Sequence, residues 1–197
     1  MEGKFPVGEF LSQRMLAEET GAVVITVRSC LRRLENEGLI ENVPKWGVRI
    51  PIDTPEKVRD RYFMREVLEV AALARLRENM NDDLKRELLR IAKKCDEMEK
   101  DSPDAYRKFA EAHNEFHSLI AKASGSELLM KFLGQMNLRS IMLYNARRIW
   151  ATREPDDSHY HEKYAEIIMN APWAEALGKV KEHIQKALDA ELQVLKS

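Results

Sequence analysis

The spacing of apolar residues predicts two short helices near the start of the chain. Ser12 can cap a first helix that ends at Gly21, and a second helix covers residues 24–37 before Gly38. The apolar positions of these two helices recur at intervals of one, three or four residues and are Met15, Leu16, Ala17, Val27, Leu31 and Leu34.

The pattern then changes, because residues 39–43 and 46–50 read as two strands of a hairpin that turns at Pro44 and Lys45. A helix, a turn, a second helix and a hairpin wing form the arrangement of a winged helix-turn-helix, which reads DNA. We therefore expect residues 1–52 to form a DNA-binding domain.

From residue 53 to residue 197 the helical period persists and predicts an all-α antiparallel bundle. Pro55 suits the first turn of a helix capped by Thr54, whose expected core stripe is Leu68, Ala71, Ala72 and Leu76. The further helices that we expect, with Ser102 as a cap and with breaks at 124–125 and 153–155, cover about 82–100, 103–123, 126–150, 157–170 and 173–195. The expected fold class is mainly α with a small β-hairpin.

Four of the five histidines have spacings that allow helices to bring them together. His113 and His117 lie four residues apart, so a helix places both side chains on one face, one turn apart. His161 and His183 each lie eleven residues from Pro172, which interrupts a helix. An antiparallel hairpin at this proline places both at the same height. We therefore expect a metal site made of four imidazoles.

The histidines also admit a simpler interpretation, because a lone histidine on a helix is more often a surface residue or a satisfied core residue than a ligand. His159 points to nearly the opposite side of a helix from His161, so we expect it to be exposed. Imidazole is the commonest ligand of zinc, nickel, copper and iron, and the mirrored second pair favours a metal site.

Composition sets outer limits on function. The chain has 197 residues, 44% hydrophobic content and a formal net charge of -1, which argue for an ordinary globular protein without a basic coat for nucleic acid. No apolar run approaches the length of a membrane span, and no secretory signal is visible. Cys30 and Cys95 are isolated, so a disulfide framework is not expected and a cytoplasmic location fits best.

Arginines on the second helix are the candidate DNA contacts. Arg28 and Arg32 share one face, and a guanidinium can meet a phosphate or a guanine. An ordinary solvated helix face is the alternative, because residues 1–50 carry seven Lys or Arg and seven Asp or Glu.

Both parts of the chain resemble a known family. Val7-Gly8-Glu9-Phe10-Leu11-Ser12-Gln13-Arg14-Met15-Leu16-Ala17, the stretch 27–40 (VRSCLRRLENEGLI) and Gly47-Val48 resemble the winged helix-turn-helix of GntR transcription regulators. Arg65-Glu66-Val67-Leu68-Glu69 and the four histidines, with Phe116, resemble the helical FCD effector domain of the FadR branch. The two resemblances cover almost the whole chain.

The resemblance implies a homodimeric transcription regulator that binds operator DNA, a divalent metal and a small anionic metabolite of the carboxylate type. It places the metal at His113, His117, His161 and His183, and we expect zinc, with nickel or another transition metal as alternatives. The expected DNA contacts are Arg14, Arg28, Arg32, Lys45 and Gly47. The expected effector contacts are Arg65 and Arg139, although Arg65 can instead form a structural ion pair with Glu69, and Arg139 can be simply exposed.

The sequence departs from the family pattern at three places. His113 stands where most relatives have aspartate, which favours zinc or nickel over manganese. Val23 and Val24 stand where relatives carry a serine and an arginine, so a helix cap and a DNA contact are missing. Met1 falls where relatives would already have completed about one helix, so we expect that the chain either lacks this first helix or begins downstream of the family's usual start.

Two other classes of function remain open. A metal-dependent enzyme of the hydrolase or lyase type is one, but Glu115 points away from the face that carries His113, so no catalytic base is evident and we expect no enzyme. A ligand-binding protein that has lost its affinity for DNA is the other.

Overall fold

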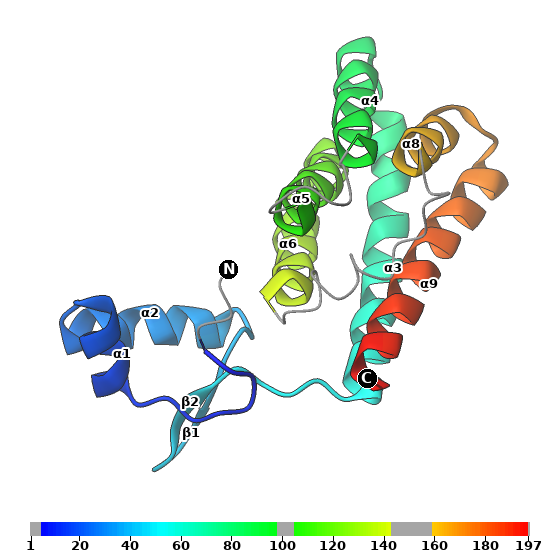
Figure 1. Ribbon diagram of the computed structural model, residues 1–197. Coiled ribbons are helices and arrows are strands. Elements are labelled where there is room, and N and C mark those ends of the chain that lie inside the picture. The colour runs from blue at the N-terminus through cyan, green and yellow to red at the C-terminus, as the bar shows by residue number, and fades with distance from the viewer. Residues whose placement is uncertain (1–4, 98–104, 143–158, 197) are drawn as a thin grey trace.

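We describe a computed structural model of the chain, which covers residues 5–97, 105–142 and 159–196. Within these ranges the chain forms eight helices and one two-stranded sheet. A small N-terminal unit of α1, α2 and the hairpin stands beside a larger group of helices, and an extended segment joins the two (Figure 1). The expected fold class, a winged helix-turn-helix followed by a helical domain, is confirmed.

The N-terminal helices form where local signals predict them. In α1 (Gln13–Thr20), the Ser12 hydroxyl accepts a hydrogen bond of 3.0 Å from the amide of Met15, and Gly21 ends the helix in the left-handed conformation. Helix α2 (Val24–Asn36) follows, and Val23 at its N-cap offers no side-chain acceptor. Helix α2 therefore begins without a side-chain cap, as the sequence indicated.

The hairpin is shorter than its apolar pattern indicated. Strands β1 (Glu41–Val43) and β2 (Gly47–Arg49) pair antiparallel, and Leu11 adds an isolated bridge to Val48. The small core between the helices and the hairpin consists of Leu16, Ala17, Val27, Ile40 and Val48.

The larger domain begins at α3 (Pro55–Glu78), where Thr54 caps the helix and Pro55 occupies its first turn. It continues through α4 (Asp82–Asp96), α5 (Ala105–Ala123), α6 (Glu127–Met142), α8 (Tyr160–Asn170) and α9 (Trp173–Lys196). The reversal expected at Pro172 separates α8 from α9, and the break expected at 124–125 separates α5 from α6. The cap at Ser102, the break at 153–155 and the end of the helix expected over 126–150 lie outside the described residues.

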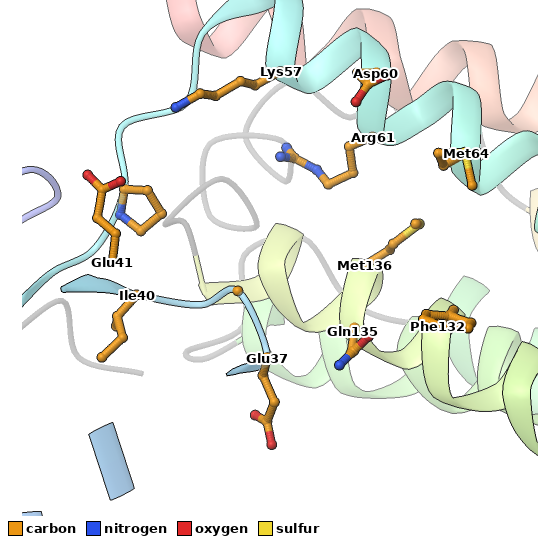
Figure 2. Close-up of a pocket in the computed structure, with 12 residues that line it drawn as sticks. Glu37, Ile40, Glu41, Lys57, Asp60, Arg61, Met64, Phe132, Gln135 and Met136 are labelled. Carbon is orange, nitrogen blue, oxygen red and sulfur yellow. The ribbon is translucent and has the colours of Figure 1, made fainter. Parts of the chain in front are cut away.

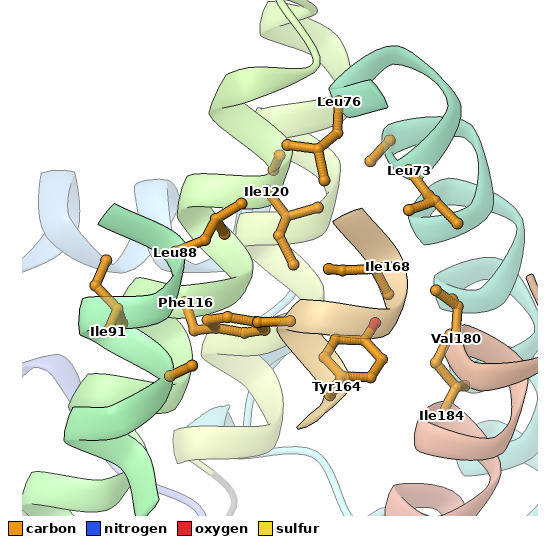
Figure 3. Close-up of a cluster of buried hydrophobic side chains, with 14 of the residues drawn as sticks. Leu73, Leu76, Leu88, Ile91, Phe116, Ile120, Tyr164, Ile168, Val180 and Ile184 are labelled. Atoms are coloured by element: carbon orange, nitrogen blue, oxygen red, sulfur yellow. The ribbon is translucent and has the colours of Figure 1, made fainter. Parts of the chain in front are cut away.

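The core of this domain lies between α3, α9 and α8 on one side and α4, α5 and α6 on the other. Figure 3 shows α3, α5, α8 and α9 contributing to it, with Phe116 and Tyr164 at its centre. The expected core stripe on α3 is wrong at Ala71, which is exposed, whereas Ala72, Leu73 and Leu76 are buried. This core fixes the heights of the helices that carry the histidines.

A buried ion network ties the connecting segment to the bundle. Arg61 on α3 makes two hydrogen bonds to the carboxylate of Asp53, at 2.9 and 3.2 Å, and a further one to Glu191 on α9. All three side chains are less than a tenth exposed. The segment between the hairpin and α3 is therefore held to the first and last helices of the larger domain.

A cavity of about 520 Å³ lies between the two domains (Figure 2). Lys57, Asp60, Arg61 and Met64 of α3 form one wall, and residues of α6 form the facing one. The N-terminal domain supplies the rest of the lining, which is Glu37, Gly38, Ile40, Glu41 and Pro51.

Candidate functional site

Three histidines converge on one point between α5 and α9. The Nε2 atom of His117 lies 3.3 Å from Nε2 of His113 and 3.1 Å from Nε2 of His183. Zinc bound tetrahedrally at about 2.0 to 2.1 Å holds its nitrogen ligands about 3.3 Å apart. The two separations from His117 are therefore close to those around a tetrahedral ion, and the possible ligand atoms of all three histidines lie within 4.8 Å of one another.

His161 on α8 lies beside this group without being a member of it. Its ring centroid is 5.3 Å from that of His113 and 6.1 Å from that of His183. The antiparallel arrangement of α8 and α9 thus brings the two histidines that flank Pro172 into one neighbourhood, while the tight convergence involves only three of the four expected ligands. His159 is exposed, as expected from its position, and it pairs with Glu162.

The opposite nitrogens of three of these rings face polar side chains. Nδ1 of His117 lies 3.4 Å from Oε2 of Glu69, Nδ1 of His161 lies 2.7 Å from Oδ1 of Asp96, and Nδ1 of His183 lies 3.2 Å from the hydroxyl of Tyr160. Carboxylates on the far nitrogen fix the tautomer of an imidazole and turn its other nitrogen toward a metal. The surroundings of the rings therefore suit metal binding through Nε2.

Asp96 also caps the start of α8. It is the last residue of α4, and its carboxylate accepts hydrogen bonds from the backbone amides of His161 and Glu162 at 3.1 and 2.9 Å. Because His159 provides no side-chain cap, Asp96 satisfies the first amides of α8 from another helix. One carboxylate thus fixes both the start of α8 and the ring of His161.

The environment favours the neutral form of His113, His117 and His183 and the charged form of Glu69 and Asp96. Burial, followed by repulsion from His117, holds the pKa of His113 and of His183 well below the ordinary value. Burial alone would raise the pKa of Glu69, but the charge of Arg65, together with the hydrogen bond from His117, outweighs burial and lowers that pKa. Neutral imidazole is the form that binds metal.

Arg65 lies inside this site in an ion pair. Its Nε donates a 2.6 Å hydrogen bond to Glu69, and both side chains are almost fully buried. Its Nη2 also lies 3.5 Å from Nε2 of His117, so the guanidinium reaches the converging nitrogens. The structural pair that the sequence left open is present, and Arg65 also lies beside the three converging histidines. The other expected effector contact, Arg139, falls in α6, and its side chain lies outside the described ones.

Sequence reasoning missed the roles of Asp96 and Tyr160. No local signal marks Asp96, because its partner His161 is 65 residues away. Glu69 was visible only as a helical neighbour of Arg65, not as a partner of His117. Glu115, by contrast, pairs with Arg90 and Lys94 on α4, away from the histidines, as its helical position indicated.

The expected DNA contacts are distributed over α1, α2 and the hairpin. Arg28 and Arg32 are exposed on α2, and Nε of Arg28 donates to Gln13 at 3.1 Å. Arg14 is exposed on α1 and pairs with Glu18. Lys45 is exposed at the tip of the hairpin in the left-handed conformation, with φ of 71°.

Gly47 has a structural role in the hairpin. A Cβ atom at this position would lie 2.6 Å from the carbonyl oxygen of Leu11, which bridges to the strand. Gly47 also has a φ of 106°, which side chains rarely adopt. The close approach of two backbones therefore accounts for the glycine.

Family models match both parts of the chain. The model described as "Bacterial regulatory proteins, gntR family" matches residues 1–50, and the FCD domain matches residues 60–186. No protein of curated function matches the chain.

Solved structures of regulators share the fold. E. coli McbR/YncC has a TM-score of 0.79 at 18% identity, over 98% of this chain and 91% of its own. A putative transcriptional regulator GntR from Rhodococcus sp. RHA1 has a TM-score of 0.66 at 20% identity, over 99% and 91%. A GntR family member from Pseudomonas syringae pv. tomato has a TM-score of 0.59 at 21% identity, over 100% and 81%.

Both family matches agree with the fold and with the order of its parts. The matching gntR family is described as bacterial regulatory proteins, and two of the similar structures are named as transcriptional regulators. No helix among residues 5–97, 105–142 and 159–196 is both long enough and apolar enough to cross a bilayer. With a GntR helix-turn-helix domain followed by an FCD domain, the chain belongs to the GntR family of bacterial transcription regulators.

Proposed function

We propose that this regulator binds one divalent metal in its helical domain and that a small carboxylate-type effector joins the metal and alters operator binding. The observation that carries the proposal is the convergence of three Nε2 atoms at 3.1 and 3.3 Å. His113, His117 and His183 hold the ion in this proposal, and His161 is the fourth ligand. Zinc is the preferred metal because its ligands are neutral nitrogens, with nickel or another transition metal as alternatives.

Arg65 supports the effector part of the proposal. Its guanidinium is buried within 3.5 Å of a proposed ligand nitrogen, and burial, which opposes its charge, is outweighed by Glu69, so its pKa is raised. A carboxylate that reaches the metal can therefore meet a fixed positive charge at the same place. Arg139 remains the second proposed effector contact.

The proposed mechanism is a shift between two arrangements of the winged domains. We propose that residues 1–52 bind the operator and that residues 53–197 bind metal, effector and a second copy. Effector binding favours one arrangement and changes the distance between the α2 helices of the two copies, which contact operator half-sites about one DNA turn apart. Such a protein acts in the cytoplasm.

Metal content and DNA binding test this proposal together. Protein purified without a histidine tag or chelator is expected to contain about one metal per chain by mass spectrometry. It is also expected to bind a duplex from upstream of its own gene, with an affinity that falls as salt rises. A metal-loaded protein without salt-dependent DNA binding would instead favour a ligand-binding protein that has lost its operator.

Replacing Asp96 by asparagine is expected to lower metal affinity about 10- to 100-fold, the range for residues that orient a ligating histidine. An asparagine carbonyl can still accept one hydrogen bond but no longer carries the charge beside His161. Competition with a zinc-binding dye measures the change. Asp83→Asn, at an exposed site on the same helix, is the control and should leave the affinity unchanged.

A second copy of the chain accounts for an apolar surface on α3. Phe63 and Val67 are 65% and 50% exposed, and Ala71 continues the same face one turn later. Phe63 and Ala71 lie four residues on either side of Val67. A two-fold axis at Val67 therefore sets Phe63 of one copy against Ala71 of the other, a large side chain against a small one.

Val67→Glu is expected to convert the proposed dimer into a monomer, because a two-fold axis sets the two new carboxylates against each other. Light scattering after size exclusion measures the mass. Val23→Glu places the same charge at an exposed valine of the winged domain and should leave the mass unchanged. A monomeric wild-type protein would contradict the dimer.

A further inference from the structure

The start of α2 exposes an unusual group of apolar side chains. Val23, Val24 and Ile25 are 65%, 42% and 70% exposed. Their neighbour Val27 is buried in the small core, so the helix has an ordinary inner face. Three consecutive β-branched side chains in water are costly unless a partner covers them.

Charged residues on the same side of α2 indicate the kind of partner. Ile25, Arg28 and Arg32 are spaced by three and four residues and are all exposed, so they share one face of the helix. The first turn of α2 contains no acidic residue. Arg28 is also steadied by Gln13 from α1. A surface that is apolar at one end and cationic along its length fits a polyanion that also displays apolar groups.

Double-stranded DNA has both properties in its major groove. Phosphates line the groove, and the C5-methyl group of thymine is the apolar group on its base edges. The side chains of valine and isoleucine have no hydrogen-bonding atoms, so they cannot read guanine, adenine or cytosine through donors and acceptors. A thymine methyl group offers them a direct contact.

We infer that the first turn of α2 recognises thymine through its methyl group, with Val24 and Ile25 as the specificity-determining residues and Val23 beside them. Arg28 and Arg32 then contact phosphates or the neighbouring bases. This inference rests on the proposed operator binding. It predicts that each operator half-site carries thymine where Val24 and Ile25 approach, and that recognition there depends on the methyl group alone.

Deoxyuridine tests the inference, because it differs from thymidine only in lacking the C5-methyl group. Binding sites are first selected from a random duplex library with the full-length protein, and thymines common to the half-sites are then replaced one at a time by deoxyuridine. Loss of one buried methyl contact is expected to weaken binding about fourfold. The affected positions should be few and the same in both half-sites.

Protein variants test whether the Ile25 side chain makes the contact with the thymine methyl group. Ile25→Ala should weaken binding to the thymine duplex and remove most of the further loss caused by deoxyuridine at its contact position, because the two changes delete one contact. Leu128→Ala, which truncates a side chain 65% exposed on α6, is the matched control and should leave both affinities unchanged.

The outcomes separate this inference from operator binding itself. Sites that lack a shared thymine, or deoxyuridine losses that are equal in the wild type and in Ile25→Ala, would overturn the inference while leaving operator binding intact. Absence of any salt-dependent DNA binding would overturn both, and association through Ile25 in DNA-free solution would then assign the surface to a protein partner.

Discussion

Replacing His117 by alanine is expected to remove the metal from the purified protein. Its Nε2 lies within 3.3 Å of the corresponding atoms of both His113 and His183, so it occupies the centre of the converging group. Loss of an outer partner of a ligand weakens binding about 10- to 100-fold, and loss of the ligand itself should exceed that range. Mass spectrometry of the isolated variant measures the metal per chain.

His159→Ala is the matched control for this experiment. His159 is exposed at the start of α8 and pairs with Glu162 rather than with the other rings. The control should retain its metal, and both variants should keep the helical circular dichroism of the wild type. Equal metal content in His117→Ala and the wild type would refute the site, and the histidines would then be packing residues.

Arg61→Ala is expected to destabilise the folded protein by about 3 to 5 kcal/mol, the usual cost of removing one partner from a buried ion network. The side chains of Asp53 and Glu191 are 3% and 0% exposed, so the variant leaves two buried carboxylates without their shared cation. The free energy of unfolding in urea, followed by circular dichroism, measures the effect.

Arg59→Ala provides the comparison, because Arg59 is exposed on the same helix. Its removal should change the free energy of unfolding by less than about 0.5 kcal/mol. Similar losses in the two variants would show that the network contributes little and that the cost arises from the helix itself.

Local signals in the sequence were sufficient for most of the fold. Ser12 and Thr54 cap their helices as predicted, and the reversal at Pro172 occurs where proline ends the helical pattern. These features depend on residues within one turn of each other, which a sequence shows directly. The hairpin and the core stripe of α3 were less exact, because burial at Ala71 depends on which helices pack nearby.

Only part of the candidate site could be predicted from the sequence, because the rest depends on how the helices pack. The i and i+4 spacing of His113 and His117 survives in any helix, and the symmetry about Pro172 needs only one reversal. Asp96 approaches His161 from a helix 65 residues earlier, so it depends on packing that no local pattern encodes. The spacing of the histidines could predict that they lie together, but their hydrogen-bond partners could be identified only from the tertiary structure.

Helix α9 connects the converging histidines to the buried ion network of the connecting segment. His183 and Glu191 lie eight residues apart on α9, about 12 Å along a helix that has no break between them. One belongs to the converging imidazoles, and the other belongs to the ion network that holds Asp53 in the connecting segment. A continuous helix moves as one rigid body. A translation or rotation of α9 at His183 therefore also displaces Glu191 and, through the ion network, the segment that connects the winged domain to α3.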